Sequence, residues 1–222
     1  MNKKSSYFCS TIGRKQFVGI TGLLLSFFVL THMLGNLLIF LGPEAYNVYS
    51  HKLVTNPFIY VAEAGLLGAF IVHVFIAIML TRENKKARPQ AYAMSASGDK
   101  ATDFVQKSMI YQGVVLLVFV VWHLKTFKYG NIYEYTSQVN GEVMRDLYRL
   151  IIEVFSSPAY VLGYSVCLVV LGMHLSHGFS SSIRTLGFNH PKYDNKVRVL
   201  GKLYAALVLI GFLAQPLYVY FN

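Results

Sequence analysis

Five long apolar segments constrain the fold of this chain more than any other feature. A helix that crosses the hydrocarbon core of a bilayer needs about 20 consecutive, mostly apolar residues. The segments that meet this requirement are residues 17–41, 58–80, 109–127, 159–179 and 203–221. We therefore expect an all-α integral membrane protein in which residues 1–222 form a single domain, with five transmembrane helices in one bundle.

The composition excludes several classes of soluble protein. Only 14% of the residues are charged, whereas soluble domains carry about 25%. The sequence contains no Gly-rich phosphate-binding loop, and its two cysteines, Cys9 and Cys167, are too few to ligate an iron–sulfur cluster. A signal peptide is the alternative interpretation of segment 17–41. That segment is too long for one, and no small-residue cleavage site follows it.

The basic residues predict the orientation in the membrane. The formal net charge is +10, which in a soluble protein would raise the possibility of nucleic-acid binding. Here the Lys and Arg residues lie between the apolar segments, and 15 of the 20 fall on the side that carries the N-terminus. Cytoplasmic loops are enriched in Lys and Arg. We therefore expect a cytoplasmic N-terminus, a C-terminus outside, and no nucleic-acid partner.

One further helix is expected in the loop that follows the third segment. Apolar residues recur there at helical spacing from Val143 to Phe155, and Asn140 could cap the helix. The pattern predicts an amphipathic helix over residues 142–156 that lies on the outer surface of the membrane.

Histidines lie inside four of the five segments, and ionisable residues at such positions are candidates for function. At 1.5 Å per residue, His32 and His123 each lie roughly 21–22 Å from the inner end of their helices. His73 and His174 lie only roughly 8–10 Å from the inner end. The four side chains therefore fall into an outer pair and an inner pair, roughly 12 Å apart in height.

Two imidazoles at one height match the axial ligands of a six-coordinate b-type haem, and two such pairs predict two haems stacked across the membrane. A proton relay would also use membrane histidines, but the inner halves of these segments hold few acidic or polar residues. A zinc site needs three or four ligands in one place. Purely structural, hydrogen-bonded histidines are the remaining alternative. His177, three residues after His174, could replace it as the inner ligand.

Several short motifs follow one another along nearly the whole chain. They are His32-x-x-x-Asn36, Gly42-x-Glu44-Ala45-Tyr46-Asn47, Glu63 with His73, Trp122-His123, Ser157-Pro158-Ala159, and His174-x-x-x-Gly178. In this order and spacing the chain resembles the dihaem cytochrome b membrane anchor of succinate dehydrogenase and fumarate reductase. It is most similar to the type in which one polypeptide of five helices holds both haems.

The resemblance implies a function and a set of ligands. His32 and His123 would bind the outer haem iron, and His73 and His174 the inner one, with the H-x-x-x-G pattern favouring His174 over His177. The chain would relay electrons between a cytoplasmic iron–sulfur subunit, itself bound to a flavoprotein subunit, and a quinone in the bilayer. Members with two haems usually use menaquinone. The expected location is the bacterial inner membrane, and the direction of the reaction stays open.

Three further residues are candidates for function. Glu63, at the outer end of segment 58–80, and Glu44, in the outer loop, could exchange protons with the quinone, or be solvated carboxylates. Arg184 could meet a haem propionate or the partner subunit, or be an ordinary cytoplasmic charge. Some family members carry a Glu, part of a proton path, where this chain has Gly172, which argues against such a path here.

Two rival functions share the general architecture. The cytochrome b anchor of a hydrogenase or formate dehydrogenase would also hold haem, although it lacks the motifs above. A proton-coupled membrane transporter would hold none. The haem content of the purified chain separates the transporter from the two cytochromes.

Overall fold

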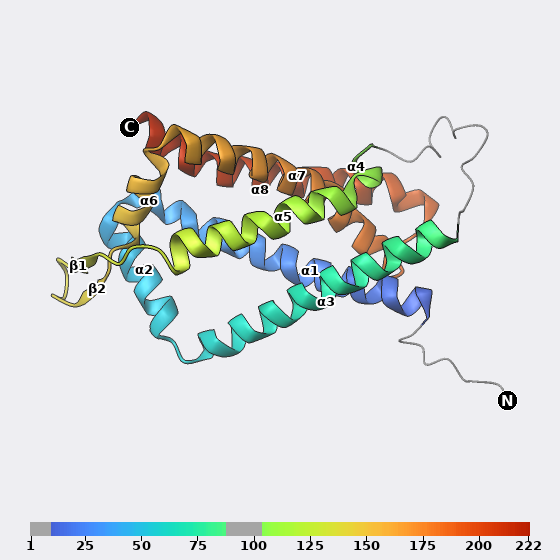
Figure 1. Ribbon diagram of the computed structural model, residues 1–222, viewed down its shortest axis with the longest axis horizontal. Helices are drawn as coiled ribbons and strands as arrows, with labels where there is room; N and C mark the ends of the chain where they lie inside the picture. The colour runs from blue at the N-terminus through green and yellow to red at the C-terminus, as the bar shows by residue number, and fades with distance from the viewer. Residues whose placement is uncertain (1–9, 88–103) are drawn as a thin grey trace.

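The computed structural model describes residues 10–87 and 104–222, and long antiparallel helices make up most of them (Figure 1). The five longest segments are α1 (Thr11–Asn36), α3 (Phe58–Lys86), α5 (Met109–His123) with the π-helix η4 (Leu124–Lys128) that continues it, α7 (Pro158–Thr185) and α8 (Pro191–Phe221). All five are long and apolar enough to cross a membrane. The prediction of an all-α, multi-pass membrane bundle is confirmed at this level.

Most of these helices are longer than their apolar segments. The hydroxyl of Ser10 caps α1 six residues before the predicted start, by accepting a hydrogen bond from the Gly13 amide at 3.1 Å. Helix α8 begins at Pro191, twelve residues early, where His190 accepts from the Lys192 amide at 3.2 Å. Hydropathy marks only the apolar part of a helix, whereas capping side chains mark where the backbone becomes helical. A short separate helix, α4 (Phe104–Lys107), precedes α5.

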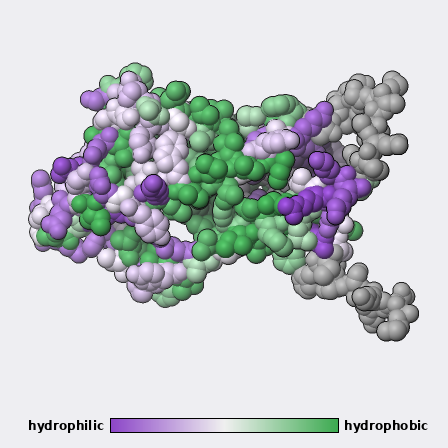
Figure 2. Space-filling model, in the orientation of Figure 1, coloured by the Kyte–Doolittle hydropathy of each residue, from purple (hydrophilic) through white to green (hydrophobic). Residues whose placement is uncertain are grey.

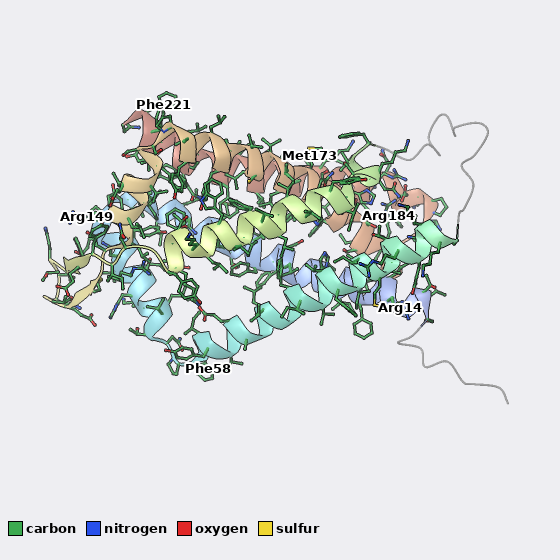
Figure 3. All side chains as sticks on the ribbon, in the orientation of Figure 1. Arg14, Phe58, Arg149, Met173, Arg184 and Phe221 are labelled. Atoms are coloured by element: carbon green, nitrogen blue, oxygen red, sulfur yellow. The ribbon has the colours of Figure 1, made fainter. Side chains whose placement is uncertain are left out.

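Shorter elements gather at one end of the bundle. They are the 3-10 helix η2 (Leu37–Leu41), α2 (Pro43–Thr55), the antiparallel strands β1 (Glu134–Thr136) and β2 (Val143–Arg145), and α6 (Leu147–Phe155). We call this the hairpin end. At the opposite end, called the Arg14 end, the Arg14 guanidinium pairs with Glu83 and so joins α1 to α3. Figure 3 shows Arg14 and Arg184 at that end, and Phe58 and Arg149 at the hairpin end.

The amphipathic helix predicted over residues 142–156 is shorter than expected. Residues Val143–Arg145 form a strand instead, paired with Glu134–Thr136 across a turn in which Gly141 has a φ of 70°. The helix starts at Leu147 because the Asp146 carboxylate, not Asn140, caps it by accepting from the Arg149 amide at 3.0 Å. Its apolar face, Leu150, Ile151 and Phe155, is buried as the periodicity predicted.

Apolar side chains cover the middle of the molecule, and polar ones gather at its two ends (Figure 2). Helices α7 and α8 pack closely, and a β-carbon at Gly201 of α8 would lie only 2.9 Å from the Ser176 carbonyl oxygen of α7. Helix α3 is the exception, because none of its 29 residues is buried. Helix α3 packs mainly against α1: their ribbons cross near the Arg14 end and separate toward the hairpin end (Figure 1).

Candidate functional site

The structure brings the four membrane histidines together as two facing pairs. His32 of α1 faces His123, the last residue of α5, with ring centroids 5.8 Å apart and ring planes at 89°. His73 of α3 faces His174 of α7, with centroids 6.5 Å apart and planes at 69°. All four residues are half-buried. These are the two pairs that helix depth predicts.

The two pairs lie at different heights in the bundle. His73 contacts α1 at Thr21 and Gly22, whereas His32 lies ten residues further along the same helix. Ten residues of α-helix span about 15 Å, slightly more than the 12 Å expected. The His32–His123 pair is nearer the hairpin end. The neighbour of His174, Met173, lies toward the Arg14 end (Figure 3).

The ring separations fit two imidazoles on opposite sides of one metal ion. A bond from a metal to an imidazole nitrogen is about 2 Å long, and the ring centre lies about 1 Å beyond, so two such rings have centroids about 6 Å apart. The two observed separations bracket this value. Among residues 10–87 and 104–222, no group of three or more His, Cys, Asp or Glu side chains is placed to hold a metal ion. The donor set therefore suits a cofactor that supplies its own equatorial ligands, as a porphyrin does.

The His174 side chain carries an independent sign of a missing partner. Its Nδ1 atom is buried and has no hydrogen-bond partner in the structure. Buried polar atoms in folded proteins are nearly always paired, and an unpaired one is costly. The unpaired Nδ1 atom belongs to one of the two imidazoles that face each other. An unpaired buried atom at this position is consistent with a group that binds at the His73–His174 pair.

His123 occupies a special position on its helix. The regular α-helix ends at His123 and continues as the π-helix Leu124–Lys128. Short π-helical stretches are rare and occur frequently at functional sites. The ring of His123 is surrounded by those of Phe119, Phe127 and Tyr164, with centroids 5.3–6.2 Å away. These aromatic rings give the imidazole a largely apolar environment.

A short polar chain leads from His32 to the hairpin end. The buried Tyr46 of α2 donates its hydroxyl proton to Asn36 Oδ1 at 2.7 Å, and Asn36 Nδ2 donates to the His32 carbonyl at 2.8 Å. The same Nδ2 atom lies 3.4 Å from Nδ1 of the His32 ring. Burial raises the pKa of Tyr46 well above its ordinary value. Tyr46 therefore stays protonated and acts as a fixed donor that holds Asn36 beside the histidine.

Glu44 and Glu63 have partners at the hairpin end. The Glu44 carboxylate accepts hydrogen bonds from the Ser137 hydroxyl at 2.6 Å, the Gln138 amide at 3.0 Å and the Tyr135 hydroxyl at 2.8 Å. These bonds, that from Ser137 above all, lower the pKa of Glu44. Glu44 thus joins α2 to the hairpin as an ionised group, and its part in proton exchange with a quinone stays a prediction. Glu63 accepts from Lys128 at 2.6 Å, an exposed ion pair between α3 and the π-helix.

Arg184 and Gly172 lie on α7. Arg184 is 3.4 Å from the Asp194 carboxylate and donates to the Ser180 carbonyl at 3.3 Å, so in this structure it links α7 to α8. Gly172 is buried, and a β-carbon there would lie 3.2 Å from a methyl group of Leu209. A larger side chain at residue 172 would therefore have to displace Leu209.

A half-open cavity of about 320 Å³ lies at the hairpin end, among α5, α6 and α7. Its walls include Trp122, Lys125, Thr126, Asn131, Val154 and Tyr160. The indole of Trp122 contacts Tyr164 at 4.7 Å between centroids, and Tyr164 in turn contacts His123 at 6.2 Å. Aromatic contacts thus connect this cavity with the His32–His123 pair.

Comparisons with protein-family models, with curated proteins and with solved structures found no match to this chain.

Sequence reasoning missed some residues around the pairs. Thr21 hydrogen-bonds to His73, but a single threonine in an apolar helix gives no signal of its own. Asn36 is part of the His32-x-x-x-Asn36 motif, and its four-residue spacing does place it beside His32. The π-helix after His123 could not be predicted, because no residue pattern distinguishes it from a regular helical turn.

Proposed function

We propose that each facing histidine pair holds one b-type haem and that the chain is the membrane anchor and electron-transfer subunit of a succinate:quinone oxidoreductase. The observation that carries this proposal is the presence of two separate imidazole pairs, at 5.8 and 6.5 Å, in helices that can cross a bilayer. Haem iron, when bound, supplies a one-electron oxidation and reduction at each pair.

The chain's own residues fix the positions of the two pairs. Each pair joins two different helices, α1 with α5 and α3 with α7, so the bundle sets both heights. The separation of about 15 Å along α1 would bring the edges of two macrocycles close enough for electrons to pass through an otherwise insulating layer. The rings of Phe127 and Tyr164 pack against His123 and help to fix its position.

The partners follow from the proposed orientation. The Arg14 end would face the cytoplasm, where an iron–sulfur subunit and a flavoprotein subunit would dock, and the hairpin end would lie outside in a bacterial inner membrane. The cavity beside Trp122 suits the headgroup of a quinone, with menaquinone the first choice. It has aromatic walls, a Lys125 ammonium and an Asn131 amide to bind carbonyl oxygens, and a ring contact toward His123.

The haem content of the purified chain tests this proposal. We expect a b-type spectrum with about two haems per chain. His32→Ala or His123→Ala should remove one haem, and His73→Ala or His174→Ala the other. His51→Ala is a matched control, because His51 lies on α2 and pairs with Glu142 at 3.0 Å, away from both pairs. A colourless chain from cells with ample porphyrin would refute the haem assignment and favour a proton-coupled transporter.

Membership of the complex needs its own experiment. The chain, purified gently from its native membrane, should carry a dicarboxylate-oxidising flavoprotein. Co-purification with a hydrogenase or formate dehydrogenase would instead assign it to another quinone-linked complex.

A transmembrane electron path has an energetic consequence. Moving one charge through 100 mV is worth about 2.3 kcal/mol. If the quinone reacts at the hairpin end, turnover in sealed vesicles should respond to an uncoupler. If turnover does not respond to the uncoupler, the quinone reacts at the Arg14 end instead.

A further inference from the structure

A buried hydroxyl on α1 contacts one of the four histidines. Thr21 is only 7% exposed and lies where α1 meets α3. Its Oγ1 is 2.7 Å from the Phe17 carbonyl oxygen and 3.2 Å from that of Val18, both one turn earlier in the helix. A hydroxyl has one proton to donate. Because a backbone carbonyl receives that proton, the lone pairs of Oγ1 are left to accept.

The atom that faces these lone pairs is Nδ1 of His73, at 3.2 Å. The shortest contact of the Thr21 hydroxyl is with the Phe17 carbonyl, and in that arrangement Oγ1 accepts from Nδ1–H. The backbone of Val18 also bonds to the His73 ring. A neutral imidazole has one protonated nitrogen and one lone-pair nitrogen. The proton on Nδ1 therefore leaves Nε2 of His73 as the atom that is free to bind a metal.

The surroundings of Thr21 make this contact rigid. A β-branched side chain has few rotamers in a helix, and the bond to Phe17 holds the hydroxyl of Thr21 in one of them. Residue 22 is a glycine, and a β-carbon there would lie 3.3 Å from Cε1 of His73. The missing side chain at Gly22 lets the imidazole approach α1 closely enough to reach Thr21.

His174 and His32 lack an equivalent acceptor. Nδ1 of His174 has none, and Nδ1 of His32 is 3.4 Å from the Asn36 amide nitrogen, which is a donor rather than an acceptor. Partners of metal-bound histidines fix the ring and raise its basicity, and their loss commonly costs 10–100-fold in affinity or activity. His73 is thus distinguished by a fixed side-chain acceptor.

We propose that Thr21 is a positioning residue for His73: its hydroxyl fixes the Nδ1–H tautomer, directs Nε2 toward the iron between His73 and His174, and lowers the reduction potential of the haem held there. This inference rests on the proposed function. The direction follows because a more basic imidazole stabilises the oxidised, more positively charged iron.

The test compares three variants of the full chain in its native membrane or complex. Thr21→Val keeps the shape but removes the acceptor, and Thr21→Ser keeps the acceptor. Thr31→Val is the matched control, because the exposed Thr31 bonds only to the Phe27 and Phe28 carbonyls of its own helix. Potentiometric titration of the haem spectrum measures both midpoint potentials, and low-temperature electron paramagnetic resonance reports the geometry of the axial ligands.

We expect Thr21→Val to raise the potential of the His73–His174 haem by an amount equivalent to up to tenfold in the redox equilibrium constant, about 59 mV for a one-electron couple. The other haem should not change. Thr21→Ser should restore the wild-type potential, and Thr31→Val should leave both haems unaltered. Haem loss through His73→Ala identifies which of the two potentials belongs to this pair.

Two results would overturn the proposal. One is an unchanged potential and resonance signal in Thr21→Val; the other is the same shift in Thr21→Ser, which would indicate a packing effect. If Thr21→Val does not accumulate, Thr21→Cys replaces it, because a thiol is a much weaker acceptor; a wild-type potential in Thr21→Cys would then contradict the proposal. A wild-type chain without haem would instead refute the proposed function itself.

Discussion

The indole of Trp122 lies so close to Gly163 that a β-carbon at residue 163 would be 2.7 Å from its Cη2 atom. This contact joins α5 to α7 beside His123, and the same indole forms part of the cavity at the hairpin end.

Gly163→Ala should therefore destabilise the bundle. The added methyl group must displace a rigid indole from the aromatic cluster of Tyr160 and Tyr164, and such overpacking typically costs about 1–3 kcal/mol. Thermal unfolding in detergent measures the loss. Gly113→Ala, on the same helix as Trp122, is the control, because a β-carbon there has no neighbour within 4 Å. Equal stability of the two variants would contradict the contact.

Gly211→Ala should weaken the contact between α8 and α1. A β-carbon at residue 211 would clash with the side chain of Met33, which is 2% exposed. The double variant Gly211→Ala/Met33→Ala removes the clash. We expect a favourable coupling energy of about 0.5–3 kcal/mol in a double-mutant cycle. Additive losses would show that the two residues do not touch.

The hairpin of β1 and β2 should loosen in acid. Hydrogen bonds lower the folded-state pKa of Glu44 below its ordinary value of 4.5. A depressed carboxyl pKa contributes stability that is full above the unfolded-state pKa and is lost as the pH falls through the folded-state pKa. The protection of the amides of residues 134–145 against hydrogen exchange, relative to the rate of an unfolded chain at the same pH, should therefore fall below about pH 4.5. In the Glu44→Gln variant the amides of residues 134–145 should be less protected at neutral pH, and their protection should no longer depend on pH in this range. Protection identical to that of the wild type would contradict the role of Glu44 in holding the hairpin.

His174, rather than His177, should be required at the second pair. His174 faces His73 with ring centroids 6.5 Å apart, and the H-x-x-x-G pattern of the sequence favours it as the ligand. We expect His177→Ala to keep two haems per chain and His174→Ala to keep one, as measured by haem extraction against protein concentration. The reverse result would show that the ligand was assigned to the wrong residue.

Lys125→Gln should impair quinone use without affecting the haems. It removes the ammonium group from the cavity beside Trp122, so we expect a higher KM for a water-soluble quinone analogue. Succinate oxidation with an artificial dye, which bypasses the membrane, should not change. Lys52→Gln on the exposed face of α2 is the matched control. Equal KM values in both variants would exclude this cavity as the quinone site.

The five helices and the two histidine pairs could be predicted because each depends on a regular period. Apolar runs of about 20 residues indicate spans, and a fixed rise per residue converts the positions of His32 and His123 into similar heights. Both predictions use one helix at a time. They therefore needed no knowledge of how the helices pack.

The elements at the hairpin end could not be predicted in the same way. Helix α2 has a polar sequence, and its buried Asn47 is held by distant partners, namely Asp146 at 2.8 Å and the Tyr148 amide at 3.0 Å. The strand Val143–Arg145 has apolar residues that also fit a helical period, so only its pairing with Glu134–Thr136 decides its conformation. Such contacts between residues about 10 to 100 positions apart are invisible to local patterns.

The surface of α3 has a consequence for its surroundings. None of its residues is buried, and Leu67, Ile71 and Phe75 are each more than half exposed. In a bilayer such side chains contact lipid tails or an apolar partner helix, so this helix contributes mainly to the outer wall of the bundle.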